Sequence, residues 1–387
     1  MPNLHLPLLT CISCMAVLLA QLGIMMYLPA LPLIAQSLNT TPSLASLSLP
    51  VYLLGMALPM LLWGKWGAAW GIKPVLIASL LLFSASSLLL TFCAQLESFL
   101  TLRCVQGVGA SGMSVMARSL VAQHFKGDTL AKALAWLSIA FVVSLGIGQF
   151  FGAVLISAFG WPTTFWCLAI GAIIHAGVVY RHLPDFNPAN NTPARWRHYL
   201  TIVRHAGFLR PALTGGLGYG VIVGFNTAAP SVFQATYGWS TSDYGTLGWA
   251  ISLAYVLGSL SVNRYMLSRG QSQLSAIATS IMVLAGIVML LGVISDPTLA
   301  GLLWLPYCFI VFGQAINYPV SLSEASGNSP VDGPYSMALC GLIHQLVAAC
   351  VGVIISLIGV QNPLYLAIIC LLLAAAVRGL NIIKPTP

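Results

Sequence analysis

Apolar stretches of about 20 residues recur along the whole sequence, and the polar segments between them are short. A helix of that length crosses the hydrocarbon core of a bilayer, because each residue advances it by ~1.5 Å. Of the 387 residues, 58% are hydrophobic and only 6% are charged, which leaves too little charge for the surface of a soluble globule. The strand-length alternation of a membrane barrel is missing. The sequence therefore predicts an all-α integral membrane protein.

We predict twelve transmembrane helices in two pseudo-symmetric six-helix bundles. The expected spans are 6–28, 44–64, 74–93, 98–123, 131–155, 162–181, 208–236, 243–266, 273–294, 299–323, 335–358 and 361–382. Residues 182–207 contain most of the only long polar stretch, so we expect a cytoplasmic linker there, between an N-terminal bundle (1–181) and a C-terminal bundle (208–387). The two halves also share short sequence echoes, such as GQFFGAVLIS in span five and ACVGVIIS in span eleven. Such internal repeats are typical of secondary transporters with a site between the halves.

The distribution of basic residues supports this count of spans. If the N-terminus is cytoplasmic, 13 of the 15 Lys and Arg residues lie in cytoplasmic segments or at the span ends beside them. An excess of Lys and Arg on the cytoplasmic side is the positive-inside pattern. We therefore expect a multi-pass membrane protein with both termini in the cytoplasm. The net charge of +8 then reflects orientation, and nucleic-acid binding is not expected.

The two remaining basic residues, Arg103 and Arg118, lie 15 residues apart inside span four. A charge deep in hydrocarbon costs at least ~2.5 kcal/mol, so both should face protein or water and form a buried polar site. None of the seven acidic residues is expected in the middle of a span. A cavity with fixed positive charge and no carboxylate favours anionic, zwitterionic or neutral cargo. Arg118 has an equal alternative, in which it snorkels to the cytoplasmic interface.

Other polar residues within the spans are candidates for substrate contacts, although each could equally bridge two helices. They are Tyr27, Tyr52, Tyr219, Asn226, Gln234, Asn317 and Tyr318. His344 and His175 are candidate proton carriers, because histidine titrates near neutral pH. For both histidines the alternative is a structural hydrogen bond to a neighbouring helix. His344 is the stronger candidate because Gln345 follows it near the middle of its span.

No cofactor, metal site or enzymatic centre is expected. Cys11 and Cys14 have the spacing of a metal or redox pair but both lie in span one. The glycines of Gly107-x-Gly109-x-x-Gly112 match a dinucleotide fingerprint but follow no strand, so helix packing explains them better. A metal cluster or a pairing of nucleophile and base is not visible in the sequence.

Several motifs together resemble those of the major facilitator superfamily, and within it the drug-exporter group of Bcr/CflA type. The matching stretches are MYLPALP from Met26 to Pro32, the R-x-x-Q-G-x-G-A pattern of Arg103, Gln106, Gly107, Gly109 and Ala110, the pairs Gly160-Trp161 and Phe165-Trp166, and the run Pro230 to Gln234. The similarity extends over all twelve spans. It implies a transporter fold and a cavity-lining position for span eleven.

The sequence departs from the family pattern at positions that matter for mechanism. Met25 stands where the first motif begins with an acidic residue, and Ala68 and Ala69 replace the Asp and Arg of the loop motif after span two. Gln149 and Ala153 replace a proline and a glycine of the antiporter motif in span five. The carboxylate that usually couples transport to protons is therefore absent.

We expect a secondary transporter that exports small molecules by alternating access as a proton antiporter. Its cargo would be a drug, or an anionic or zwitterionic metabolite such as a siderophore. There are two alternatives. The protein could take up its cargo, or it could be a non-transporting receptor or scaffold built on a transporter fold. The expected partners are the small-molecule substrate, protons and the lipid bilayer, and the protein is expected to be a monomer. Arg103 is further expected to hydrogen-bond helix ends or polar groups of span one.

Overall fold

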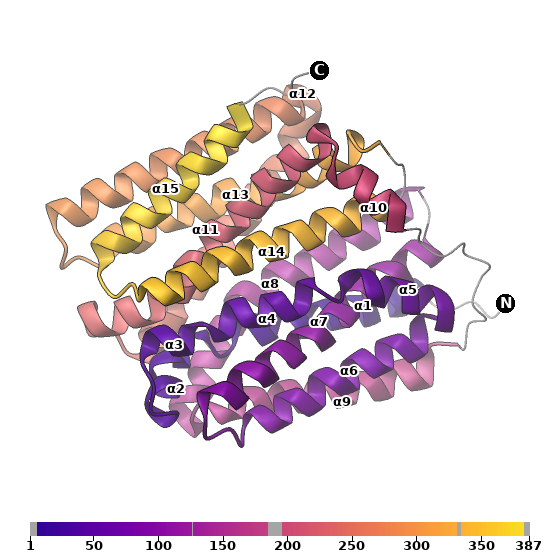
Figure 1. Cartoon of the computed structure of the whole chain (residues 1–387), viewed down its shortest axis with the longest axis horizontal. Coiled ribbons are helices and arrows are strands. Elements are labelled where there is room, and N and C mark those ends of the chain that lie inside the picture. The colour runs from indigo at the N-terminus through magenta and orange to yellow at the C-terminus, as the bar shows by residue number, and fades with distance from the viewer. Residues whose placement is uncertain (1–5, 126, 185–195, 331–333, 383–387) are drawn as a thin grey trace. The chain divides into compact units, whose positions relative to one another are not determined.

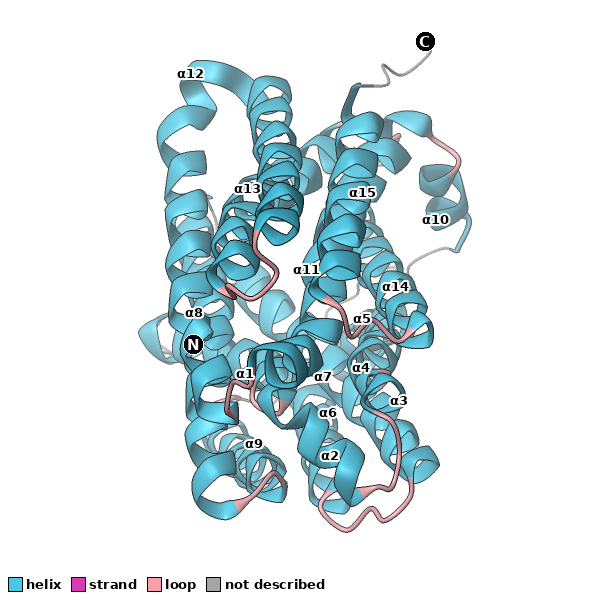
Figure 2. Cartoon of the chain, turned by 90° about the vertical axis from the view of Figure 1, so that its left-hand side faces the viewer, coloured by secondary structure: helices cyan, strands magenta, loops and turns pink. Residues whose placement is uncertain are grey.

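The computed structural model describes residues 6–125, 127–184, 196–330 and 334–382. Every regular element in these ranges is a helix, and Figure 2 shows helices joined only by loops. This confirms the predicted all-α class. The centre of the predicted linker, residues 185–195, and both chain ends lie outside the described residues.

The first half of the chain follows the predicted spans, with several breaks. Its elements are α1 (Leu6–Met25), the 3-10 helix η1 (Leu28–Ala30), α2 (Leu31–Ser37), α3 (Pro42–Ser46), α4 (Ser48–Ala57), α5 (Met60–Trp70), α6 (Ile72–Leu90), α7 (Leu96–His124), α8 (Gly127–Phe159) and α9 (Pro162–His182). The second predicted span is divided into α3, α4 and α5. Pro59 stands before α5 with φ −86° and ψ 1°, and it lacks the N–H that would continue the hydrogen bonds of α4.

Among the described residues, 11 helical stretches are long and apolar enough to cross a membrane. The fourth predicted span, α7, is not among them, although it is 29 residues long. Its glycines, serines and the two arginines lower its hydropathy, while its length exceeds what a bilayer requires. With α7 included, the helices supply the twelve predicted spans.

The second half of the chain contains six helices as the structure defines them. They are α10 (Trp196–Val203), α11 (Ala206–Tyr237), α12 (Thr241–Ser295), α13 (Gly301–Gly327), α14 (Pro334–Ile358) and α15 (Pro363–Ile382). Two predicted spans lie within α12, which is interrupted at Gly270, where φ is 73° and ψ is 169°. The short helix α10 lies in the segment predicted as linker, and its Ile202 is buried against Phe208 and Cys340.

Contacts divide the chain into two compact units that do not follow the order of the sequence. Unit one contains residues 1–30 and 51–193, and unit two contains residues 31–50 and 194–387. The segment 31–50, which follows span one in the sequence, therefore packs with the C-terminal helices. Within unit two, α12 lies beside α13 and α11 beside α14 (Figure 1).

Small residues on α7 allow close approach of its neighbours in unit one. A Cβ atom at Gly107 would clash with the carbonyl oxygen of Tyr52 in α4. At Gly109 it would lie 2.7 Å from the backbone nitrogen of Phe83 in α6. The helices thus pack backbone against backbone around the section of α7 that carries Arg103.

Candidate substrate and coupling sites

Arg103 is fully buried in unit one, where it connects three helices. Its Nη1 donates hydrogen bonds to the carbonyl oxygen of Gly23 in α1, at 3.0 Å, and to Oε1 of Gln106 one turn along α7. Nε2 of Gln106 then donates to Oγ of Ser87 in α6, at 2.7 Å. The expected contact between Arg103 and span one is therefore present. Ser87 was not predicted, because nothing in the sequence links it to Arg103.

Aromatic rings enclose the same guanidinium. Its Cζ lies 4.1 Å from the ring centroid of Tyr27, 4.5 Å from that of Tyr52 and 5.8 Å from that of Phe165. A cation over an aromatic face is attracted by the ring quadrupole, and more strongly where water is excluded. The hydroxyl of Tyr52 also donates to the carbonyl oxygen of Ala20 at 2.7 Å, which fixes its ring.

The charge of Arg103 is not neutralised by an acid. Within the described part of the chain, the structure records no carboxylate at ion-pair distance from it. Its Nε and Nη2 atoms are buried and have no hydrogen-bond partner, and Oε1 of Gln21 in α1 is also buried without one. Unsatisfied buried donors cost free energy, and more when they carry charge. Two donors of the fixed guanidinium fork are therefore buried without an acceptor.

Arg118 differs from Arg103: burial, the first of its two equally weighted alternatives, is not found. Its side chain is exposed in unit one. Fifteen residues correspond to just over four helical turns, so Arg118 points about 60° away from Arg103 around the axis of α7. It also stands six residues before the end of the helix at His124. The two arginines do not form one cluster.

Predicted residues of unit two gather around Tyr318 in α13. The side chains of Tyr219 in α11 and Tyr255 in α12 are close enough to Tyr318 to interact electrostatically. The ring of His344 in α14 has its centroid 5.0 Å from that of Tyr318. Tyr255 was missed, since a single tyrosine in an apolar helix carries no distinguishing signal. Four helices thus bring together three phenols and an imidazole.

His344 is 1% exposed and close to a sulfur atom. Its Nε2 lies 3.4 Å from Sγ of Cys340, one turn earlier in α14, and its ring also forms a hydrogen bond with the backbone of Ala212 in α11. Gly215 of α11 makes room for the imidazole, since a Cβ there would lie 2.5 Å from Nε2 and would clash with Oγ of Ser321. The other candidate, His175 in α9 of unit one, is also buried, with no partner for its Nε2.

The remaining predicted side chains bridge helices or lie partly exposed. Nδ2 of Asn226 donates to the hydroxyl of Tyr307 at 2.9 Å, and Nδ2 of Asn317 donates to the carbonyl oxygen of Thr214 at 3.3 Å. Both asparagines therefore bridge α11 and α13, which is the alternative to substrate contact that the sequence left open. Gln234 is partly exposed near the end of α11.

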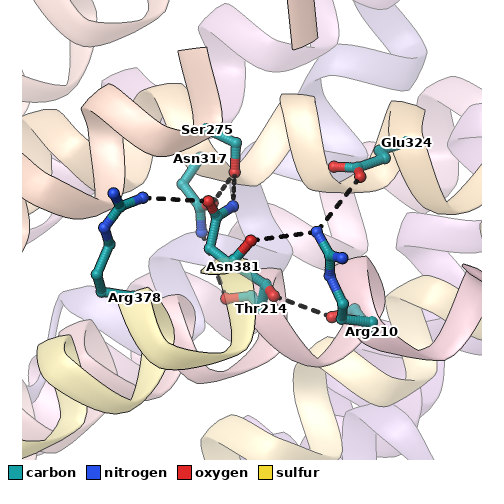
Figure 3. Close-up of polar contacts among 7 residues, drawn as sticks. All are labelled: Arg210, Thr214, Ser275, Asn317, Glu324, Arg378 and Asn381. Carbon is teal, nitrogen blue, oxygen red and sulfur yellow. Dashed lines mark hydrogen bonds and ion pairs between the residues drawn. The ribbon is translucent and has the colours of Figure 1, made fainter. Parts of the chain in front are cut away.

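A polar network joins four helices of unit two, and Figure 3 shows its side chains converging. Nδ2 of Asn381 in α15 donates to Oγ of Ser275 in α12 at 2.5 Å, and the carbonyl oxygen of Asn381 accepts from Nη2 of Arg210 in α11 at 3.2 Å. Arg378 donates to Oδ1 of Asn381 at 3.3 Å. Arg210 also lies 4.0 Å from Glu324, in the last turn of α13. This network fastens one end of the C-terminal helices.

Comparison with known protein sequences identifies the family of this chain. The family model of the Major Facilitator Superfamily matches residues 13–332. The chain is 24% identical over 284 residues to the bicyclomycin resistance protein homolog of Haemophilus influenzae, covering 72% of this chain and 71% of that protein. It is 26% identical over 371 residues to the chloramphenicol resistance protein of Pseudomonas aeruginosa, covering 95% of this chain and 88% of that protein. These names agree with the predicted drug-exporter group.

Solved structures of low sequence identity share the fold. A D-xylose-proton symporter superposes with a TM-score of 0.78 at 14% identity, over 96% of this chain and 97% of that one. The human organic anion transporter MFSD10 (TETRAN) superposes with a TM-score of 0.70 at 16% identity, over 97% and 100%. The chain therefore belongs to the Major Facilitator Superfamily and is a multi-pass membrane transport protein rather than an enzyme.

Proposed function

We propose that the protein exports small molecules across the bacterial inner membrane by alternating access, and that protons drive it. The resistance functions named in its relatives support export, since a pump that removes an antibiotic from the cytoplasm protects the cell. The cargo is anionic, zwitterionic or neutral, and the protein works as a monomer.

The observation that carries the proposed cargo class is the buried guanidinium of Arg103. Its Nε and Nη2 donors have no partner, and aromatic rings surround it where an acid would otherwise neutralise it. A carboxylate or carbonyl oxygen of the cargo would satisfy these donors, whereas a lipophilic cation would add like charge. Tyr27 and Tyr52 belong to the same proposed contact region.

The proposed set of substrate contacts also includes residues away from Arg103. The exposed side chain of Arg118 is free to meet an anion, and Tyr219 and Tyr318 supply hydroxyl groups in unit two. Asn226, Asn317 and Gln234 complete the proposed set, although the first two already have protein partners.

His344 is the proposed proton carrier. It is buried and stands beside the phenol of Tyr318, and its ring also contacts Sγ of Cys340 and the backbone of Ala212. Proton binding would place a positive charge among the three tyrosines, and proton release would remove it. His175 is the second candidate, in unit one.

We also propose that both termini and residues 182–207 are cytoplasmic and that this segment links two bundles of six spans. The concentration of Lys and Arg in those segments supports the orientation.

Export is tested in a bacterial strain deleted for its own drug pumps. Expression of the protein should raise resistance to bicyclomycin or chloramphenicol, and inverted membrane vesicles should accumulate the drug when a proton gradient is applied. A matched panel of anionic, neutral and cationic compounds then tests the cargo class. Preference for the cations would overturn the charge argument. Accumulation only in right-side-out vesicles would favour the uptake alternative, and accumulation in neither would reject transport of these compounds.

A further inference from the structure

Three helix ends of unit one meet at one place, which we call the α5–α6–α9 corner. Gly71, with φ 93°, turns the chain from Trp70 at the end of α5 into the first turn of α6. The helix α9 lies beside α6 (Figure 1). Nζ of Lys73, in the first turn of α6, lies 5.3 Å from the ring centroid of Tyr180, near the end of α9. The corner therefore brings together segments that are more than 100 residues apart in sequence.

A row of aromatic rings runs along α5 to this corner. The indoles of Trp66 and Trp70, one turn apart, are stacked with centroids 5.8 Å apart. Trp63 meets Trp66 edge to face, and its Nε1 donates to the carbonyl oxygen of Val108 in α7 at 2.9 Å. The row is thus anchored at its inner end, whereas Trp70 and Tyr180 are 63% and 72% exposed. Exposed Trp and Tyr at the ends of membrane-spanning helices are typical of the headgroup layer.

The corner is positively charged. Lys65 and Arg181 are exposed, and Lys73 is partly exposed. The three helices α5, α6 and α9 contain no Asp or Glu to offset these cations. Ala68 stands where the family pattern has Asp, so the turn between spans two and three carries only positive charge. An exposed group of cations without acids attracts an anion.

The basic residues at the ends of α11 and α15 in unit two are arranged differently. Arg210 lies 4.0 Å from Glu324 and donates to the carbonyl oxygen of Asn381, and Arg378 donates to the side chain of the same Asn381. Those arginines serve the network shown in Figure 3. The cations of the α5–α6–α9 corner point outward instead, beside exposed aromatic rings.

The length of α6 indicates what surrounds the corner. Its 19 residues span about 28 Å, close to the ~30 Å thickness of the hydrocarbon core. The first turn, which carries Lys73, therefore reaches the level of the lipid phosphates. Lysine and arginine bind phosphate through charge-assisted hydrogen bonds.

We propose that the α5–α6–α9 corner binds the headgroup of an anionic phospholipid. Lys73 and Arg181 contact its phosphate, and Trp70 and Tyr180 pack against its glycerol backbone. The ammonium group of Lys73 has three donors, so it reaches a phosphate while it stays over the Tyr180 ring. The cytoplasmic leaflet as the source of the lipid rests on the proposed orientation, whereas binding itself does not depend on transport.

Binding is tested on purified protein by native mass spectrometry with phosphatidylglycerol and with phosphatidylcholine. The wild type should bind phosphatidylglycerol about tenfold more tightly, and equal affinities would overturn the proposal. Lys73→Gln with Arg181→Gln should remove most of this preference, since each Lys or Arg near an anionic lipid surface contributes a factor of about five. Arg204→Gln, which removes an exposed arginine of unit two, is the control and should keep the preference. The same loss in both would overturn the assignment to this corner.

A second pair of variants adds charge without removing a contact. Ala69 is exposed, one turn after Lys65, so Ala69→Asp places a carboxylate in the corner and Ala69→Ser is its neutral match. The aspartate should weaken phosphatidylglycerol binding about fivefold and leave phosphatidylcholine unchanged, while the serine changes neither. Thermal unfolding in phosphatidylcholine checks that all variants are folded, and this pair decides if the double variant is not. Unchanged binding by Ala69→Asp would overturn the proposal, and so would displacement of the lipid by an equal concentration of glycerol 3-phosphate, which would indicate a soluble anion.

Discussion

The guanidinium carbon of Arg103 lies 4.1 Å from the ring centroid of Tyr27, and Nη1 of the same arginine donates to the carbonyl oxygen of Gly23 at 3.0 Å. The arginine thus holds α1 both by a hydrogen bond and by an aromatic face. A planar guanidinium can do both at once, whereas an ammonium group cannot.

Arg103→Lys should therefore lose most transport, by at least tenfold, while the protein still inserts. Lysine keeps the charge but cannot reach Gly23 and Gln106 while stacking on Tyr27. Drug efflux is measured together with the amount of protein in the membrane. Arg118→Lys, an exposed arginine of the same helix, is the control and should retain transport. Normal transport by Arg103→Lys would reduce the role of Arg103 to charge alone.

Arg118→Ala should weaken binding of anionic compounds about three- to tenfold and leave neutral ones unchanged. The loss of one partly solvated charge–charge contact is worth about 1 kcal/mol, which corresponds to a factor of this size. Binding is measured on purified protein with matched anionic and neutral compounds. An unchanged affinity for anions would leave the snorkelling alternative for Arg118.

His344→Gln should abolish proton-driven efflux but preserve exchange of substrate between the two sides of vesicles without a gradient. Glutamine retains hydrogen-bonding groups yet cannot take up a proton at neutral pH. His175→Gln is the matched control, because this histidine is also buried in a span. Efflux by His344→Gln that still follows the proton gradient would exclude His344 as the carrier. The result for His175→Gln then shows whether the second candidate carries the proton.

Gly215→Ala should destabilise the protein by about 1 to 3 kcal/mol, in the range of overpacking in a core. Its Cβ would meet Ser321 and lie 2.5 Å from Nε2 of His344, so α13 or α14 has to move. Gly379→Ala in α15 is the control, since nothing lies within 4 Å of the added atom. Thermal unfolding in detergent compares the two. Equal unfolding temperatures would contradict the tight packing at His344.

Asn190→Cys tests the orientation, although this residue lies outside the described part of the chain. A membrane-impermeant maleimide should label it in inverted vesicles and leave it unlabelled in intact cells, because the linker is proposed to be cytoplasmic. Labelling in intact cells would contradict the twelve-span topology.

The span pattern was predictable because the need to bury about 20 apolar residues acts on each segment separately. The burial of Arg103 in a polar site was predictable for a related reason, because a charge in an apolar span has to avoid the lipid. Gln106, which follows one turn later, offered a polar partner. For Arg118 the sequence left burial and exposure as equal alternatives, because the outcome depends on how neighbouring helices surround the end of α7. Spacing along a helix gives the direction of a side chain but not what covers it.

Long-range relationships were the other part that the sequence did not reveal. Tyr255 joins Tyr318 only through the packing of α12 against α13, and α10 is a helix in a stretch whose polar composition indicated a linker. Residues 31–50 belong to unit two because they pack against α11 and α14, where Ser43 meets Ser356 more than 300 positions away. Contacts of this kind leave no periodicity in a single sequence.

The separation of 313 residues between Ser43 and Ser356 has a consequence for biogenesis. At about 5 to 20 residues per second, a ribosome needs roughly 15 to 60 s to synthesise the chain between them. During that interval the first helices are already entering the membrane, while the surface that residues 31–50 finally occupy does not yet exist. The nascent N-terminal helices must remain inserted without this contact, and unit two is complete only after translation has passed α14.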